Sequence, residues 1–369
     1  RVVAALYAAG AVYWAAFVSW GNPDFRFFDW LYELQFLTVT QLALQTGQIP
    51  YHVSLYCEEL GSRGFTWGTD RFFALPFATV SPQILALIFL DVPAWIAVQT
   101  VFLYTLGFVG VVRWIRKLNL SLTASAFVVI LYTFNGFFSG KVGIGALPDM
   151  GGYFLVPWVL WLWNRFIEEV DAGMRQKLLL SLQFSFLLLF VLMQGSPHPL
   201  QAIILGGFLL VLLSPRQIPW YLLSLILFVL MGSYFIWPIL TAGGYAGTGR
   251  LIMGGYGSHR DLLSIPVELM QALTKPYTAQ TDGVWEKTAY ISWFGLLLTG
   301  GGLFFAWRSE SVLVLTQKKF VLVIGLLCVL MLDHFFRSIH MFLHFLTQDI
   351  YRAPALDQLP ARIMIIPLF

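Results

Sequence analysis

The sequence predicts an all-α, polytopic integral membrane protein with about ten membrane-embedded helices. Of its 369 residues, 58% are hydrophobic and only 11% are charged, whereas an ordinary globular domain has about 25% charged residues. Long apolar runs recur along the chain and alternate with polar segments, which is the pattern of successive membrane helices. The formal net charge is +3 and there is no basic tract, so nothing indicates a nucleic-acid partner.

The first apolar run, residues 2–20, carries no charge and is long enough to cross about 30 Å of hydrocarbon. It predicts the first transmembrane helix, ended by Asn22 and Pro23. The run 75–90 is interrupted by Pro76 and Pro82 and is too short to predict a span. Several later runs have fewer than the roughly 20 residues that a straight span needs, so we expect some half-helices packed inside protein. These later runs are 93–112, 120–138, 153–163, 178–193, 200–213, 218–240, 291–307, 320–333 and a segment that begins near Ile363.

Basic residues are concentrated in the short loops on one side of the predicted membrane protein. On the other side lie the long segments 21–92, 139–152, 241–288 and 334–361, where basic residues are sparser and nearly balanced by acids. By the positive-inside rule the short basic loops are cytoplasmic and the long segments face outward. We therefore expect one transmembrane domain over residues 1–369, with two large outer loops at 21–92 and 241–288. The short loops hold Arg113, Arg116, Lys117, Arg165, Arg175, Lys177, Arg216, Arg308, Lys318 and Lys319.

The first outer loop carries three acidic candidates, Asp24, Asp29 and Glu33, directly after the first predicted span. Carboxylates near hydrocarbon are costly unless water, a cation or a hydrogen bond compensates them. The segment 31–46 mixes leucines with Glu33 and glutamines, which predicts an amphipathic helix at the interface. Two interpretations stay open for Asp24 and Asp29: they belong to a functional site, or they only cap this helix, with Trp30 as an interfacial anchor.

Substrate-binding candidates come from the other outward segments. Lys141 and Asp149 flank a glycine-rich stretch without the Gly-Lys-Ser/Thr ending of a nucleotide-binding loop, so contacts to an anionic headgroup are the simpler prediction. His198 lies in a Gln-Gly-Ser-Pro-His turn, for which a structural turn and the edge of a site are both open. Arg250 and Arg260 in the second large loop suit the oxygens of a diphosphate, and a solvated loop also explains them.

Metal and redox chemistry are only weakly indicated by the residues. His340 and His344 are four positions apart, but no placed carboxylate completes a zinc site, and an interfacial helix explains their spacing. Cys57 and Cys328 form neither a disulfide framework nor a metal-ligand spacing. The Gly-x-Ser-x-Gly, His-Glu-x-x-His and dinucleotide fingerprints do not occur, so the soluble-enzyme chemistries that use them are unsupported.

A series of short motifs extends over nearly the whole chain. In order they are Phe25–Trp30, Gly47–Tyr51, Ser81–Pro82, Gly151–Trp161, Gly195–His198, Ser264–Pro276, Glu286–Tyr290 and Leu359–Arg362. One span, an acidic motif, an interfacial helix and a return to the membrane open the series. This order resembles that of polytopic membrane glycosyltransferases of the C-type (GT-C) fold, and in particular the YfhO-like bacterial membrane proteins.

The resemblance implies an enzyme that moves a sugar from a polyprenyl-phosphate carrier to an extracytoplasmic acceptor. In that group an acidic residue of the first outer loop acts as base or metal-holding group, and Asp29 is the matching position, with Asp24 and Glu33 as neighbours. The loop lacks the paired Asp-x-Asp signature of better-characterised members, which leaves catalysis open and the cofactor unknown, a divalent metal being one candidate. Cations would stabilise the leaving phosphate, and the outward candidates are Arg250, Arg260, Arg352 and Arg362.

Two other classes of function compete with the enzyme. One is a non-catalytic subunit of the same fold that scaffolds a larger membrane complex or binds a lipid. The other, a transporter for lipid-linked sugars, would place charged residues inside the spans, where they are nearly absent. The expected partners are membrane lipids and a lipid-linked sugar donor, and the expected location is a bacterial plasma membrane. Because the chain begins at Arg1 and ends where an apolar segment starts, we expect it to be part of a longer polypeptide.

Overall fold

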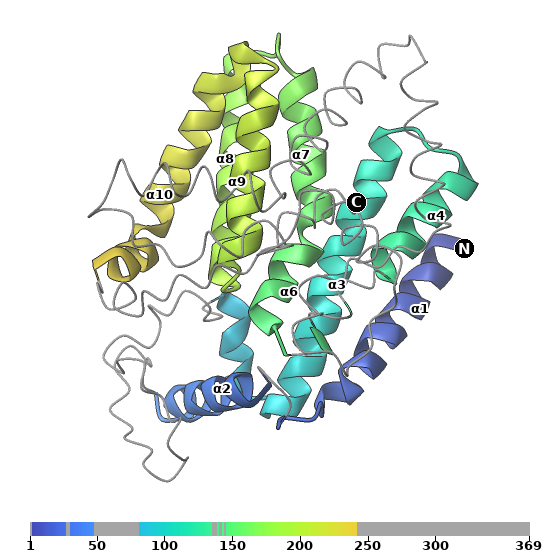
Figure 1. The fold of residues 1–369 in the computed structure, drawn as a ribbon, viewed down its shortest axis with the longest axis vertical. Helices are drawn as coiled ribbons and strands as arrows, with labels where there is room; N and C mark the ends of the chain where they lie inside the picture. Colours follow the sequence, from blue (N-terminus) through green and yellow to red (C-terminus); the bar gives the residue numbers. More distant parts are fainter. Residues whose placement is uncertain are drawn as a thin grey trace, which may run out of the picture.

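The structure is a computed structural model, and it describes residues 2–26, 30–47, 81–134, 139, 142–143 and 145–241. Within these ranges the regular structure is helical and no strand occurs (Figure 1), which confirms the predicted all-helical class. The predicted spans 291–307, 320–333 and beyond 363, and nearly all of the loop 241–288, lie outside the described residues. The total of about ten membrane-embedded helices therefore stays a prediction.

Short 3-10 helices, labelled η, separate several of the α-helices. The described elements in chain order are α1 (Val2–Phe17), η1 (Ser19–Gly21), α2 (Trp30–Gln45), η4 (Pro82–Ile88), α3 (Val92–Lys117), α4 (Leu122–Thr133), α6 (Leu147–Phe154), α7 (Val156–Glu168), α8 (Met174–Met193), α9 (Pro197–Leu212), η5 (Pro215–Gln217) and α10 (Ile218–Thr241). Side chains cap the N-termini of two helices. Asp91 Oδ1 accepts a hydrogen bond from Ala94 N at the start of α3, and Ser121 Oγ accepts one from Ala124 N at the start of α4.

Three segments of the described chain are long and apolar enough to cross a membrane: Val92–Lys117, Met174–Met193 and Pro215–Tyr234. The predicted end of the first apolar helix, at residue 20, needs correction, and whether this helix crosses a membrane stays a prediction. The helix ends at Phe17, and the backbone turns through left-handed conformations at Ser19 (φ 50°) and Trp20 (φ 57°). The described part of α1 is apolar throughout, and its end lies three residues before the predicted one.

Helix α3 is the centre of the N-terminal half, where it contacts α1, α4, α6 and α7. Four almost fully buried aromatic rings join these helices: Trp14 of α1, Tyr104 of α3, Tyr132 of α4 and Phe154 of α6. The ring centroids of Tyr104 and Tyr132 are 6.3 Å apart, and those of Trp14 and Phe154 are 5.1 Å apart. Such offset and edge-to-face pairs stabilise the core beyond simple burial.

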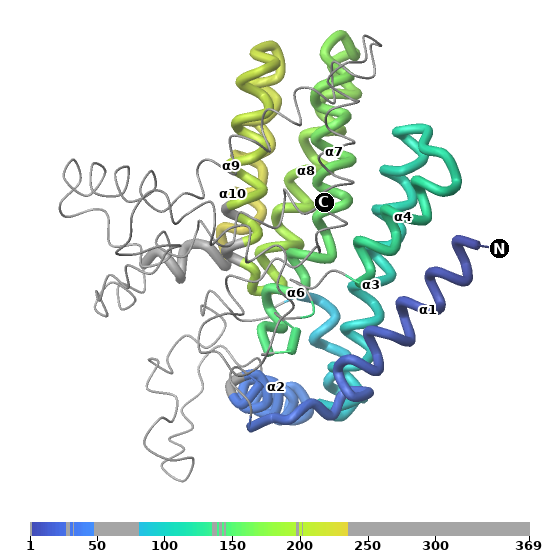
Figure 2. The backbone as a smooth tube through the Cα atoms, turned by 45° about the vertical axis from the view of Figure 1, so that its right-hand side comes forward, coloured from blue at the N-terminus to red at the C-terminus, as the bar shows by residue number. Residues whose placement is uncertain are grey.

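Helices α8, α9 and α10 form a second group, which α7 joins to α3 (Figure 1, Figure 2). The pair α8 and α10 is held by serine hydroxyls. Ser185 Oγ donates to Ser224 O at 2.8 Å, and Ser181 Oγ donates to Trp220 O at 2.9 Å. Small polar residues let apolar helices approach closely and bond across the interface, as is common in membrane bundles.

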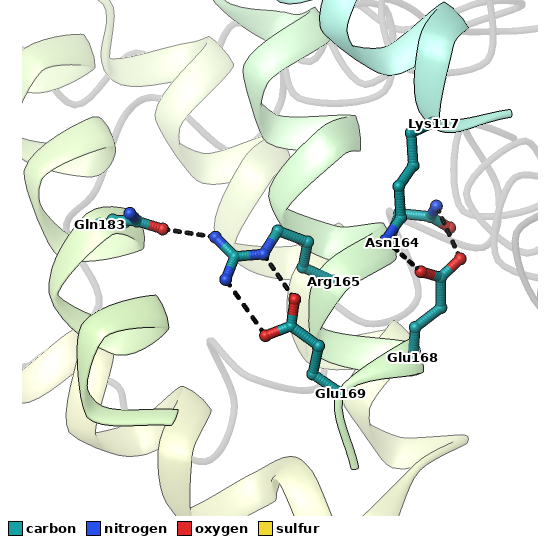
Figure 3. A network of polar contacts seen from close by, with 6 residues as sticks. All are labelled: Lys117, Asn164, Arg165, Glu168, Glu169 and Gln183. Atoms are coloured by element: carbon teal, nitrogen blue, oxygen red, sulfur yellow. Dashed lines mark hydrogen bonds and ion pairs between the residues drawn. The ribbon is translucent and has the colours of Figure 1, made fainter. Parts of the chain in front are cut away.

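Charged side chains gather at one end of the bundle, the upper end in Figure 1, where α3, α7 and α9 end and α8 and α10 begin. Lys117 Nζ and Glu168 Oε2 are 2.5 Å apart, and Arg216 Nη1 and Asp171 Oδ1 are 3.6 Å apart. Arg165 pairs with Glu169 at 2.7 Å and also donates to Gln183 (Figure 3). The three short basic connections that the structure describes therefore lie at the same end of the bundle, which we call the cationic end. The side of a membrane that this end faces stays a prediction.

Gly21 ends η1 with φ +94° and touches the backbone at the start of α3, where a Cβ on Gly21 would lie 1.8 Å from Pro93 O. Gly21→Ala should therefore destabilise the fold by about 2 kcal/mol, since it combines left-handed strain with a backbone clash. Gly47→Ala is the matched control, because Gly47 also has a positive φ, +71°, but nothing lies within 4 Å of its added Cβ. Thermal unfolding in detergent should give a lower melting temperature for Gly21→Ala. Equal melting temperatures would contradict the close approach to Pro93.

Candidate functional site

Helix α2 lies across the end of the bundle opposite the cationic end (Figure 1, Figure 2). Its first residue, Trp30, is only 2% exposed, and Trp30 Nε1 donates to Gly143 O at 3.2 Å. Near its other end, Gln41 Nε2 donates to Leu90 O at 2.7 Å. Both partners are distant in the sequence, so α2 is tied to the bundle at two points. A helix over the predicted range 31–46 is confirmed, but its predicted amphipathic pattern is not, because Leu31 and Leu42 are 42% and 54% exposed on the same face as Thr38. Its depth in a membrane stays a prediction.

Of the two acids predicted as catalytic, the structure describes Asp24, while Asp29 lies outside the described residues. Asp24 Oδ1 accepts from the backbone N–H of Arg26 at 3.0 Å and from its Nε at 3.3 Å. These donations, the backbone one first, hold the pKa of Asp24 below its ordinary value. Asp24 therefore forms an exposed local pair with Arg26, since its side chain is 61% exposed.

Glu33 and Asp149 both lie in the first turn of a helix, where the helix dipole favours negative charge. Glu33 is half-buried in α2, and Asp149 is buried in α6 with 7% exposure. Helix α6 is unusual because every one of its residues is buried. Asp149 is therefore held inside the molecule, in contrast to the exposed Asp24.

The turn between α8 and α9 is bonded to α6. Ser196 Oγ donates to Pro148 O and accepts from Gly152 N, the latter at 3.1 Å. His198 follows in the first turn of α9, but its side chain is outside the described part of the structure. The sequence leaves open whether this segment is a structural turn or the edge of a site. These bonds support the structural turn, because they attach α6 to the connection between α8 and α9.

A cluster of three glutamines, not predicted as a group from the sequence, lies beside this turn. Gln194 Oε1 accepts from Gln83 Nε2 at 2.8 Å and from Gln99 Nε2 at 3.0 Å. Gln194 and Gln99 are 1% and 4% exposed. Trp95 Nε1 adds a bond to Gln83 O at 3.0 Å. The sequence does contain a signal for this cluster: Gln83 and Gln99 are single amides within the apolar runs 75–90 and 93–112. An isolated amide in such a run needs a buried hydrogen-bond partner.

The bond from Trp30 to Gly143 joins two of the predicted candidate regions. Trp30 directly follows Asp29 in the sequence, and Val142 and Gly143 directly follow Lys141. Asp29 and Lys141 themselves lie outside the described residues, as do Arg250, Arg260, Arg352 and Arg362. The structure therefore brings together the sequence neighbours of one acidic and one basic candidate, and it does not test the arginines.

A divalent metal needs several carboxylate, histidine or cysteine ligands in one place. Within the described ranges, no group of three or more such residues could hold a metal ion. The histidines His340 and His344 and both cysteines lie outside these ranges. Comparisons with protein-family models, curated proteins and solved structures gave no match for the chain, so the site is interpreted from its own residues.

Proposed function

We propose that the protein is a membrane glycosyltransferase of the C-type fold, which moves a sugar from a polyprenyl-phosphate carrier to an acceptor at the end covered by α2. The observation that carries this proposal is the hydrogen bond from Trp30 to Gly143. It ties the chain next to Asp29 to the chain next to Lys141, at the end opposite the cationic loops. Glycosyl transfer from a phosphate carrier needs an acid to take the acceptor proton and a cation to stabilise the leaving phosphate. Asp29 and Lys141, the sequence neighbours of the bonded segments, are the residues that we propose for these two roles.

In the proposed reaction, the acceptor hydroxyl oxygen attacks the anomeric carbon of the sugar. The bond from that carbon to the carrier phosphate breaks, and its electron pair leaves on the phosphate oxygen. The hydroxyl proton passes to the Asp29 carboxylate, while Lys141 stabilises the charge that develops on the phosphate. The further cations proposed to stabilise the leaving phosphate are Arg250, Arg260, Arg352 and Arg362.

The bundle offers an apolar surface to the lipid part of such a substrate. Large apolar side chains are exposed along α8 and α10, among them Phe186 (55%), Ile226 (57%) and Leu230 (65%). Exposed apolar area of this kind is costly in water and suits a lipid environment. The proposed location is a bacterial plasma membrane, with the α2-covered end facing outward and the cationic end facing the cytoplasm.

The activity is tested by radiolabel transfer in membranes that contain the chain, compared with membranes from cells carrying an empty vector. A panel of polyprenyl-phosphate sugars serves as donors, and labelled products are separated from the lipid phase. Transfer from at least one donor that depends on the chain is the expected result. A panel on which no donor gives chain-dependent transfer would overturn the enzymatic proposal.

A non-catalytic subunit of the same fold is the alternative, and the state of Asp24 favours it. Of the two proposed catalytic acids, the structure describes Asp24. Its carboxylate accepts hydrogen bonds from Arg26, which lower its pKa. If Asp29 has no role either, the chain would scaffold a larger membrane complex or bind a lipid without converting it. Co-purification of stoichiometric partner subunits together with unchanged transfer in an Asp29 variant would support this alternative.

A further inference from the structure

The exposed face of helix α3 combines apolar side chains with two arginines. Val98, Phe102 and Val109 are 53%, 41% and 42% exposed, and Arg113 and Arg116 are exposed at the cationic end of the same helix. At 3.6 residues per turn, these five positions fall within about 60° of one another around the helix. They form one stripe that is apolar along its length and basic at its end. We call it the α3 stripe.

Arg113 has no carboxylate partner among the described residues. The two acids at the end of α7 are engaged elsewhere: Glu168 lies 2.5 Å from Lys117, and Glu169, directly after the helix, lies 2.7 Å from Arg165 (Figure 3). The Arg113 guanidinium instead lies over the ring of Trp158, with Cζ 4.8 Å from the ring centroid. Stacking of this kind leaves the edge of the guanidinium, with its N–H donors, open to an anion.

Trp158 is a rigid support for Arg113. Its Nε1 donates to Leu106 O at 2.8 Å, and its ring packs edge-on against Trp161 at a centroid distance of 5.7 Å. The ring also fills the space beside Gly110, where an added Cβ would come within 2.7 Å of Trp158 Cδ1. Because Trp158 is fixed on three sides, the guanidinium is held at a defined level of the helix surface.

We infer that the α3 stripe binds an anionic phospholipid of the leaflet at the cationic end, with the phosphate on Arg113 and Arg116 and an acyl chain along Val109 and Phe102. Charge complementarity selects the occupant, since Arg113 and Arg116 have no ion pair within the described ranges and lie at the end of an apolar stripe, which matches a lipid phosphate with its chains. Phe102 lies about 16 Å from Arg113 along the helix axis, close to half of the roughly 30 Å hydrocarbon core. The inference rests on the membrane location in the proposed function and does not depend on glycosyl transfer.

The test measures lipid retention by the purified full-length chain. The wild type, the double variant Arg113→Gln with Arg116→Gln, and the control Arg175→Gln are titrated in detergent with dioleoyl-phosphatidylglycerol, and bound lipid is counted by native mass spectrometry. Arg175 is exposed at the same end without an ion pair in the described structure, so its replacement lowers the charge without touching the stripe. The double variant should bind phosphatidylglycerol about tenfold more weakly, while the control should bind like the wild type.

Three results would overturn the inference. Equal loss of phosphatidylglycerol binding in Arg175→Gln would indicate diffuse charge attraction, and equal binding of dioleoyl-phosphatidylcholine by the wild type would show no preference for an anionic lipid. Displacement of the lipid by millimolar inorganic phosphate would indicate a site for free anions. A second variant, Phe102→Ser, probes the apolar part of the stripe and should weaken lipid binding without changing the charge. Because the readout is bound lipid and not product, failure here leaves the glycosyltransferase proposal untouched, and failure of the transfer assay leaves this site untouched.

Discussion

Asp29→Asn is expected to lower glycosyl transfer by about 10²–10⁴-fold, the usual contribution of a positioned general base. Asparagine keeps the size and polarity of the side chain but cannot accept the acceptor proton. The measurement is the initial rate of radiolabel transfer from the best donor of the panel, in membranes with matched amounts of wild-type and variant chain. The expected loss follows from the proposal that the acid beside Trp30 takes the proton of the acceptor.

Asp24→Asn is the matched control for this prediction. Asp24 is an acid of the same loop, but its carboxylate is held by Arg26 N and Nε and has a lowered pKa, so its loss should change transfer by less than about threefold. Equal losses in the two variants would show a general effect of loop charge. Unchanged transfer in Asp29→Asn would remove the role given to Asp29 and favour the non-catalytic subunit.

Gln194→Met is expected to destabilise the described bundle by about 2–3 kcal/mol, because a buried donor left without an acceptor costs that much. In the wild type, Gln194 Oε1 accepts from both Gln83 and Gln99. Methionine keeps the unbranched shape that the contact with Gly151 requires, where an added Cβ would come within 2.4 Å of Gln194 Cγ. The measurement is the free energy of unfolding in mixed detergent micelles.

Two controls separate the lost acceptor from a general effect of substitution. Gln176→Met changes an exposed glutamine in the first turn of α8 and should leave the free energy of unfolding within about 0.5 kcal/mol of the wild type. The double variant Gln99→Met with Gln194→Met removes the buried donor together with its acceptor, and should recover part of the loss. Gln99→Met is therefore also measured alone. If the double variant loses as much free energy of unfolding as the two single variants together, the hydrogen bond between these amides is not the cause of the destabilisation.

The helices that the sequence predicts best are those with long apolar runs and clear ends. The runs 93–112, 178–193 and 218–240 correspond to α3, α8 and α10, whose ends differ from the predicted ones by five residues or fewer. Apolar length and terminal polar or proline residues are local properties, so they can be read without knowledge of the packing. The same holds for α2, whose mixed leucines and glutamines give the start and end to within one residue.

The features that the sequence does not reveal depend on contacts between distant segments. The first run continues in composition to Trp20, yet α1 ends at Phe17, where the chain turns so that Gly21 can reach Pro93. Likewise, Gln83, Gln99 and Gln194 look like isolated amides until the fold brings them together. For the candidate site, the sequence names Asp29 and Lys141 separately, and the bond from Trp30 to Gly143 is the added information.

The most direct test of the central claim, that the α2-covered end faces outward in a membrane, is side-specific cysteine labelling in intact cells. In a background with Cys57 and Cys328 replaced by serine, single cysteines are placed at two exposed positions, Thr38 on α2 and Arg175 at the cationic end. A membrane-impermeant maleimide should label Thr38→Cys in intact cells, and Arg175→Cys only after permeabilisation. The reverse pattern, or labelling of both positions in intact cells, would contradict the proposed orientation and with it the outward-facing site.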